Sequence, residues 1–401
     1  MTSSQETPPR EYGGRTLSLR ELFRNNIRQY FMLLALVGIM IFFQVSTDGT
    51  LLRPLNLTNL LLQNSYIVIM AIGMLLVIVA GHIDLSVGSI VGFIGALAAV
   101  MIVNMGVHYV PATLICLLMG AAIGAAQGAL VAFLKIPSFI VTLGGMLIFR
   151  GLSLTILDGR SVGPFPTGFQ RLSSGFIPDL FGAEGLHLTS LLIAALVCAS
   201  LVFLSWRERQ NQRKYDFDLE PLPFFLLKNI VVVGAIMYLS YLLSSYKGFP
   251  NVLIIMFILM IVYTFIATQT TLGRRIYALG GNVKAAKLSG IKTDRLVLYT
   301  FINLGVLSAL AGLVFAARLN TATPKAGNAF ELDVIAAVFI GGAAMTGGVG
   351  TVIGAVIGAF IMGVLNNGMS IMGVGIDFQQ VIKGIVLLAA VFFDVYSKKT
   401  A

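Results

Sequence analysis

Long apolar runs, separated by short polar stretches, fill most of this sequence. Runs such as 30–45 and 252–268 approach the ~20 residues that an α-helix needs to cross ~30 Å of hydrocarbon. Because such runs recur from one end to the other, the pattern predicts an all-α polytopic membrane protein without a large soluble domain. The predicted segments are 29–46, 64–80, 86–104, 109–134, 138–157, 188–206, 222–243, 251–270, 296–316, 334–345, 351–370 and 379–394.

The apolar pattern breaks at two places. In the stretch AGHIDLSVGS, residues 80–89, a histidine, an aspartate and two serines stand between long apolar runs. Around 330–350, Glu331 and Asp333 precede a segment that is too short to span a bilayer and is followed by several glycines. Non-helical backbone at membrane depth persists only where protein or a water-filled cavity covers it. These breaks therefore predict a pore, a cavity or a hinge, and 334–345 is interpreted as a half-helix.

Charged side chains near these segments have two interpretations each. Asp84 either caps the N-terminus of the third segment or contacts a solute. Arg150 and Lys383 lie in otherwise apolar segments, where a basic side chain either extends toward the outer interface or pairs with an acid. The candidate acids are Glu331 and Asp333.

Glycines recur every four residues in two of the apolar segments. Such spacing lets two helix backbones approach closely in lipid. The motif G-A-x-I-G-A occurs in both segments, at 120–125 and 354–359, which is compatible with an internal repeat relating two halves of the chain. The predicted helix-packing positions are Gly120, Gly124, Gly128, Gly354 and Gly358.

Composition and charge agree with a membrane protein. Of the 401 residues, 57% are hydrophobic and only 11% are charged. The net charge of +10 does not indicate nucleic acid, because an excess of Lys and Arg on the inner side of a membrane explains it. With the N-terminus inside, 19 basic residues fall in inner segments and 6 in outer loops. Both termini are therefore expected in the cytoplasm, with 1–28 as an N-terminal segment and 396–401 as a tail.

The densest positive charge lies in 271–295, between two apolar segments. Six basic residues there outweigh a single acid, Asp294. Asn282 is a good N-cap residue, residues 283–289 can form two helical turns, and Gly290 can adopt the left-handed C-cap conformation. The pattern thus predicts a short capped helix within this segment.

The predicted short helix has a charged face and an apolar one. Lys284 and Lys287 would share one face, while Ala285, Ala286 and Leu288 would offer small apolar surface for docking. A solvated inner loop is the plain interpretation of such a basic stretch, and an element that docks on a partner is the other.

Motifs for catalysis are missing from the sequence. No phosphate-binding loop of the form G-x-x-x-x-G-K-[ST] occurs, so the chain has no ATP site of that kind. No HExxH, CxxC or GxSxG motif is found, and Cys116 and Cys198 are interpreted as core residues of apolar segments. We therefore expect no enzyme activity, no metal and no cofactor in this chain.

The stretch GRRIYALGGNVKAAKLSGI, 273–291, resembles the cytoplasmic coupling segment of permease subunits from bacterial ABC importers of monosaccharides, the ribose, galactose and xylose group. Other stretches resemble those permeases in the same order along 50–395. They are DLSVGS (84–89), KIPSFIVTL (135–143), ELDVIAA (331–337), LNNGM (365–369) and KGIVLLAAVFFD (383–394). The extra pair of apolar segments in 188–243 makes the chain most similar to the xylose and multiple-monosaccharide types.

The resemblance implies a type II ABC importer-like permease, with about ten core helices and two extra ones in a single transmembrane domain over 29–395. It implies import of neutral monosaccharides such as xylose, arabinose, galactose and glucose across the bacterial inner membrane. The implied partners are a second permease copy, a periplasmic sugar-binding protein, and a cytoplasmic ATPase of two chains or one tandem fused chain, which would bind ATP and Mg²⁺.

The resemblance also assigns residues. Segment 271–295 would couple the permease to the ATPase through Gly280, Gly281, Asn282, Lys284, Ala285, Ala286, Lys287, Ser289 and Gly290. The candidates for the translocation pathway are Asp84, Ser86, Ser138, Phe139, Asn366 and Asn367. Two alternatives stay open: the same machinery for another small polar solute such as a nucleoside, and a secondary transporter driven by an ion gradient.

Overall fold

The structure is a computed structural model that describes residues 19–182, 185–215 and 217–399. Residues 1–18 of the predicted N-terminal segment and 400–401 of the predicted tail lie outside this part of the chain. Internal contacts divide the chain into two compact units. Unit 1 contains Pro178–Gly248, and unit 2 consists of Phe31–Ile177 and the chain from Phe249 onward. The single domain expected over 29–395 stays a prediction.

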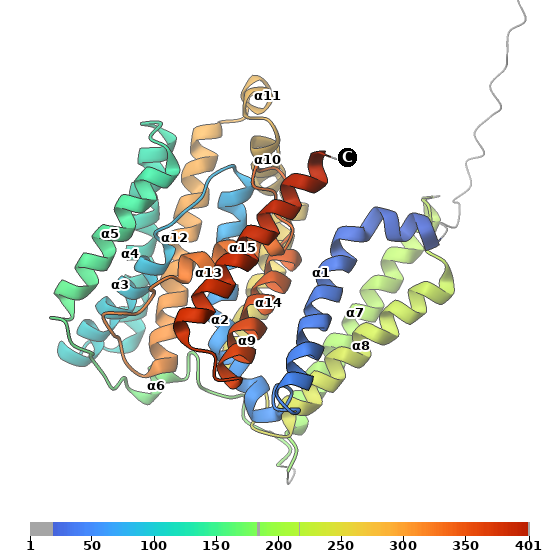
Figure 1. Cartoon of the computed structure of the whole chain (residues 1–401), viewed down its shortest axis with the longest axis horizontal. Helices are drawn as coiled ribbons and strands as arrows, with labels where there is room; N and C mark the ends of the chain where they lie inside the picture. Colours follow the sequence, from blue (N-terminus) through green and yellow to red (C-terminus); the bar gives the residue numbers. More distant parts are fainter. Residues whose placement is uncertain (1–18, 183–184, 216, 400–401) are drawn as a thin grey trace, which may run out of the picture. The chain divides into compact units, whose positions relative to one another are not determined.

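Unit 2 holds most of the helices (Figure 1). They are the part of α1 (Leu19–Ser46) after Tyr30, α2 (Pro54–Val79), α3 (Val87–Ala99) with its π-helical continuation Val100–Asn104, α4 (Tyr109–Ala132), α5 (Ser138–Ile156), α6 (Thr167–Gln170), α9 (Asn251–Gln269), α10 (Thr271–Gly281), α11 (Val283–Leu288), α12 (Thr293–Leu319), α13 (Phe330–Ile340), α14 (Val352–Ile371) and α15 (Ile376–Lys399).

Each of the twelve predicted apolar segments overlaps a helix. In the described ranges, nine helices are long and apolar enough to cross a membrane: α2, α3 with its continuation, α4, α5, α7, α8, α9, α12 and α14. The first predicted segment contains a shorter apolar stretch, Met32–Ser46. These findings confirm the all-α polytopic membrane fold. The predicted half-helix is α13, whose 11 residues reach about 16 Å at 1.5 Å per residue.

The central helix of unit 2 is α2. Every residue from Ile67 to Ala80 is buried, because α9, α12, α13 and α14 all pack against it. A helix that is apolar on all sides either faces lipid or lies in the core of its bundle. Here the neighbouring helices shield it, and α2 forms the core on which the broken segments rest.

The predicted packing glycines lie at close helix contacts. A Cβ atom added at Gly124 of α4 would overlap the carbonyl oxygen of Phe301 in α12. One added at Gly358 of α14 would overlap the carbonyl oxygen of Ala337 in α13. Added Cβ atoms at the other three positions would collide in the same way, Gly120 and Gly128 with α12, and Gly354 with Gly341. A side chain at these positions would push the paired helices apart.

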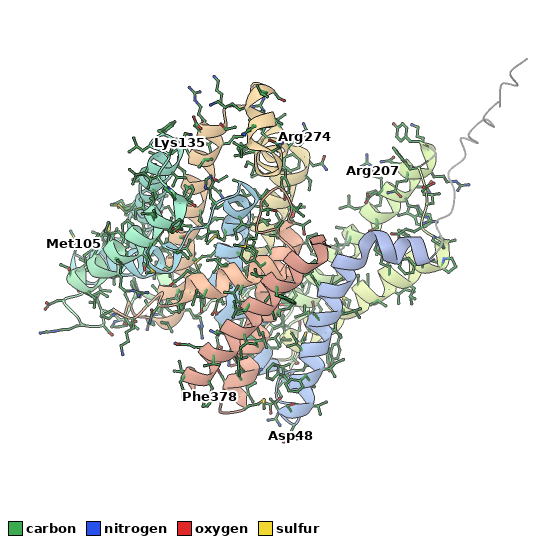
Figure 2. The ribbon with its side chains drawn as sticks, turned by 45° about the horizontal axis from the view of Figure 1, so that its top comes forward. Asp48, Met105, Lys135, Arg207, Arg274 and Phe378 are labelled. Carbon is green, nitrogen blue, oxygen red and sulfur yellow. The ribbon has the colours of Figure 1, made fainter. Side chains whose placement is uncertain are left out.

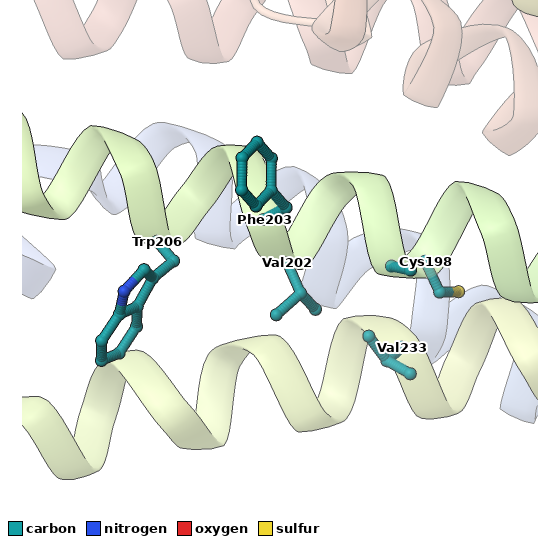
Figure 3. A pocket seen from close by; sticks show the side chains of 6 residues that line it. Cys198, Val202, Phe203, Trp206 and Val233 are labelled. Atoms are coloured by element: carbon teal, nitrogen blue, oxygen red, sulfur yellow. The ribbon is translucent and has the colours of Figure 1, made fainter.

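Unit 1 contains the helix pair that the sequence predicted at 188–243. It consists of α7 (Leu188–Lys214) and α8 (Leu222–Ser244), which pack side by side (Figure 1). An apolar pocket of about 720 Å³ opens on this pair, as Figure 3 shows. Its lining residues are Cys198, Ala199, Val202, Phe203 and Trp206 of α7 and Val233 of α8. Both Cys116 and Cys198 are buried and free, as predicted.

Unit 2 has two ends along its helices. Lys135 and Arg274 lie at the end that carries α11, which we call the α11 end, and Asp48 and Phe378 lie at the opposite end (Figures 1 and 2). At the α11 end, the ammonium of Lys135 approaches Asp294 to 2.5 Å. Both side chains are exposed, so this pair adds little stability, but it joins the α4–α5 loop to the start of α12.

Candidate functional site

The basic segment 271–295 folds into α10, α11 and the start of α12 at the α11 end of unit 2. Thr270 caps α10 by accepting a hydrogen bond from the N–H of Gly273 at 3.2 Å. The side chain of Asn282 caps α11 by accepting the N–H of Ala285 at 3.0 Å. Gly290, with φ +79°, takes the left-handed conformation after α11. The predicted capped helix is therefore confirmed, one residue shorter than expected.

Most of α11 is exposed, including both lysines that were expected on its surface, Lys284 and Lys287. Its apolar side chains differ from the prediction. Leu288 is 90% exposed and Val283, which the sequence reasoning did not single out, is 53% exposed. Ala286 is only 4% exposed, so its assignment to the docking surface is wrong.

The reason for the Ala286 correction is the tight turn after α11. The N–H of Ile291 donates a hydrogen bond to the carbonyl oxygen of Ala286 at 3.1 Å, which folds the chain back over this side of the helix. Ala285 and Ser289 stay exposed, and the Ser289 hydroxyl donates to the carbonyl oxygen of Ala285 at 3.0 Å. The exposed apolar positions of α11 are thus Val283, Ala285 and Leu288.

A second group of predicted residues meets at the break before α3. Asp84 is buried, and its carboxylate accepts hydrogen bonds from the N–H of Ser86 at 2.7 Å and from the Ser86 hydroxyl at 2.6 Å. Gln127 of α4 bonds to the same hydroxyl oxygen at 3.0 Å. The hydroxyl of Ser138, at the start of α5, accepts the N–H of Ile83 at 3.4 Å. Three helices are therefore tied to the loop 80–86.

Asp84 is not the N-cap residue of the third segment, and that interpretation is wrong because Ser86 occupies the N-cap position of α3. Burial raises the pKa of the Asp84 carboxyl from 3.8 to about 6, while the hydrogen bonds from Ser86 act in the opposite direction. The loop that carries Asp84 lies outside the spanning helices.

A third polar group joins α13, α14 and α15. The ammonium of Lys383 lies 2.9 Å from Oδ2 of Asp333, and Nδ2 of Asn366 donates to the same oxygen at 3.3 Å. Of the two interpretations of Lys383, pairing with an acid is therefore confirmed. The neighbouring Asn367 belongs elsewhere, because its amide exchanges hydrogen bonds with Asn56 of α2 at 2.9 and 3.2 Å.

Glu331 lies between these two polar groups. A Cβ atom added at Gly88 of α3 would overlap Oε2 of Glu331, which places the carboxylate directly against α3. The charges that act on it come from Arg150, Asp333 and Asp84. We call the set Asp84, Ser86, Gln127, Glu331, Asp333, Asn366 and Lys383 the polar track of unit 2.

Three buried acceptor atoms of the polar track have no hydrogen-bond partner in the described part of the chain: Oε2 of Glu331, Oδ1 of Asp333 and Oδ1 of Asn366. An oxygen of this kind accepts hydrogen bonds from hydroxyl donors. Asn366 is among the pathway candidates predicted from the sequence, whereas Gln127 is not. The signal for Gln127 is an amide within a glycine-rich apolar run. Phe139, by contrast, is an exposed residue of α5 with no place in the track.

Comparisons with known proteins agree with this architecture. The family model described as "Branched-chain amino acid transport system / permease component" matches residues 56–391. The xylose transport system permease protein XylH of Escherichia coli K12 is 40% identical over 378 residues, which cover 93% of each chain. The ribose import permease protein RbsC of the same strain is 36% identical over 339 residues, 84% of this chain and 85% of its own.

A ribose import permease protein RbsC from Bacillus subtilis is 34% identical over 356 residues, which cover 88% of each chain. No solved structure gives a significant match. The family match extends from the start of α2 into α15 and so includes the polar track and the segment with α10 and α11. The chain therefore belongs to the family of permease components of branched-chain amino acid transport systems.

Proposed function

We propose that this chain is the membrane permease subunit of an ATP-driven ABC importer that carries neutral monosaccharides of the xylose, arabinose, galactose and glucose type into a bacterial cell. The observation that carries the proposal is α11: a capped, exposed helix with two lysines and exposed Val283 and Leu288, presented at one end of unit 2. The similarity of the whole chain to a xylose permease, over 93% of both chains, supports a sugar as the solute.

The proposed assembly places the α11 end in the cytoplasm. The excess of basic residues on that side supports this orientation, with both termini inside the inner membrane. An ATPase, of two chains or one fused tandem chain, binds ATP and Mg²⁺ and receives α11 in a groove. A second copy of the permease completes the pathway. A periplasmic sugar-binding protein docks at the opposite end of unit 2, where one loop connects α5 to α6 and another connects α12 to α13.

The polar track is the proposed contact for the sugar. A neutral sugar offers hydroxyl groups that donate and accept hydrogen bonds, and it needs no countercharge. The unpartnered oxygens of Glu331, Asp333 and Asn366 are acceptors for such hydroxyls, and the acids Asp84 and Asp333 are already held by other groups of the chain. Solute contact is brief in this proposal, because affinity resides in the binding protein.

Reconstitution in proteoliposomes tests the proposal. The chain is combined with its cognate ATPase and binding protein, and uptake of radiolabelled xylose is measured with and without ATP on the ATPase side. We expect uptake that requires ATP, the ATPase and the binding protein together. Uptake by this chain alone, driven by a proton or sodium gradient, would show a secondary transporter. ATP-driven uptake of a nucleoside but of no sugar would show the same machinery with a different solute.

A further inference from the structure

The helix that leads into α11 meets the interior of unit 2 through main-chain atoms. Gly280, the penultimate residue of α10, lies so close to the end of α2 that an added Cβ atom would overlap the carbonyl oxygen of Val79. The same Cβ would lie 2.5 Å from the amide nitrogen of Gly348. The N–H of Gly348 in turn donates a hydrogen bond to that carbonyl oxygen at 2.9 Å. Three segments thus meet at one point with no side chain between them.

The loop 341–351, which contains Gly348, has a defined shape. Gly347 and Gly348 have φ values of +83° and +74°, a conformation that side chains disfavour. The N–H of Ala344 donates to the carbonyl oxygen of Val349 at 3.0 Å and closes the loop. The hydroxyl of Tyr277, one turn before Gly280 on α10, donates to the carbonyl oxygen of Gly350 at 2.8 Å. α10 therefore holds this loop at two places.

The loop continues directly from α13. The N–H of Gly341 donates to the carbonyl oxygen of Ala337 at 2.8 Å, and that of Ala343 to Val338 at 3.1 Å, so the first part of the loop is fixed to the last turn of α13. Asp333, which pairs with Lys383, lies in the first turn of the same helix. A chain of direct contacts therefore runs from α11 through α10, Gly280 and the loop to the polar track.

We propose that Gly280 and loop 341–351 form a joint through which displacement of α11 moves α13 and with it Asp333. The proposal rests on the proposed function, in which the ATPase moves α11. Close-packed protein interiors pass on displacement with little compression. Where two backbones are in direct contact, one segment can move against the other without a change of side-chain rotamer. A side chain at Gly280 would instead force α10 away from α2 and the loop.

The test compares two alanine variants in the full complex. Gly280→Ala adds a methyl group inside the joint. Gly234→Ala adds one on α8, where nothing lies within 4 Å of the new Cβ atom. We measure sugar uptake per ATP hydrolysed in proteoliposomes. For Gly280→Ala we expect this ratio to fall roughly tenfold, within the usual range of coupling between sites, and for Gly234→Ala we expect the wild-type ratio. A wild-type ratio in Gly280→Ala would overturn the joint.

A second variant covers the case in which Gly280→Ala does not fold. Tyr277→Phe removes one hydroxyl and its bond to Gly350 but leaves the ring in place. We expect it to lower the uptake ratio roughly fivefold. Leu332 of α13 is 48% exposed. The thiol introduced by Leu332→Cys should react with a maleimide at a rate that changes on addition of ATP, which reports movement of α13.

When Tyr277→Phe is combined with Leu332→Cys, the maleimide reaction rate should no longer change on addition of ATP. If the Tyr277 hydroxyl only stabilised the fold, the yield of complex would fall but the ATP-dependent change would remain. An unchanged ratio together with an intact ATP response in Tyr277→Phe would refute the joint. Absence of ATP-driven uptake by the wild-type complex would instead refute the proposed function, and the joint with it.

Discussion

Lys383 donates a hydrogen bond to Oδ2 of Asp333 at 2.9 Å and so ties α15 to the half-helix α13. The aspartate side chain is 6% exposed and the lysine side chain 25%. Removing two charges from water is costly, and their attraction inside a protein often does no more than offset that cost. The pair is therefore better understood as a constraint on the position of α13 than as a source of stability.

Removing one partner of this pair should be more harmful than removing both. Lys383→Met leaves the Asp333 carboxylate buried without its cation, which typically costs about 3–5 kcal/mol. The double variant Lys383→Met with Asp333→Asn should recover most of that loss, because the amide still suits Asn366. Thermal stability of the detergent-solubilised protein, followed by size-exclusion chromatography after heating, measures the difference. Equal stability of the single variant and the wild type would contradict this prediction.

The contact of α4 with α12 should not tolerate even a methyl group. Gly124→Ala places a Cβ atom onto the carbonyl oxygen of Phe301, and overpacking of this kind costs about 1–3 kcal/mol. Gly144→Ala is the matched control on α5, because nothing lies within 4 Å of its added Cβ. The heating assay should show a clear loss for Gly124→Ala and none for Gly144→Ala. Loss in both variants would point to a general intolerance of helix substitutions instead.

Neighbouring alanines of α11 should respond differently to a charge. Ala285→Asp combined with Leu288→Asp adds charge on the exposed side, where it should abolish copurification of the ATPase while leaving the yield of the permease unchanged. Ala286→Asp buries a carboxylate against the chain itself, which should lower the yield of folded protein several-fold. The amount of permease in membranes and the amount of ATPase retained on it are measured together. Normal yield for Ala286→Asp would contradict the observed burial.

The loop 80–86 should become more stable as pH falls. The pKa of Asp84 is raised from 3.8 to about 6 by burial, so the folded chain binds this proton more tightly than the unfolded chain does. The contribution of Asp84 to stability is therefore complete below its ordinary pKa and is lost as pH rises through about 6. Relative to Asp84→Asn, the wild type should gain stability as pH falls from about 7 to about 4, through the folded pKa of about 6 toward the ordinary pKa of 3.8.

The Asp84→Asn comparison also removes a competing effect. Burial lowers the pKa of His82 in the same loop, with a smaller contribution from Lys135, and this histidine makes the loop less stable as pH falls. Since His82 is present in both proteins, its titration cancels in their difference. A difference in thermal midpoint that stays constant over this pH range would refute the assignment.

The helices themselves could be predicted from the sequence because burial in lipid demands long apolar runs. The start of α2 shows the limit of that reasoning. The polar residues Asn56 and Asn64 interrupt the apolar run, so the sequence predicts a segment that begins only at 64. In the structure, α2 begins ten residues earlier, at Pro54. Inside the fold the amide of Asn56 bonds to Asn367, and Nδ2 of Asn64 donates to the carbonyl oxygen of Ala359. Such pairings connect residues about 300 positions apart and leave no local trace.

In the functional segments, too, local features can be predicted from the sequence, whereas contacts between distant residues cannot. The caps of α11 depend on local chemistry, and Asn282 and Gly290 revealed them. The burial of Ala286 and the contact of Gly280 with Val79 depend on how the chain folds back on itself. Spacing shows which residues share a helix face, but the neighbour of that face is a property of the whole fold. The same holds for Lys383, whose position in an apolar segment allowed two outcomes until Asp333 was found beside it.

Trp206 lines the apolar pocket of the α7–α8 pair and is the only tryptophan in the sequence. Intrinsic fluorescence excited at the indole band therefore originates in unit 1 alone. Brominated acyl chains should quench it wherever the pocket is open to the bilayer. An optical probe in unit 2 therefore has to be introduced by substitution, whereas the α7–α8 pair already carries a natural one.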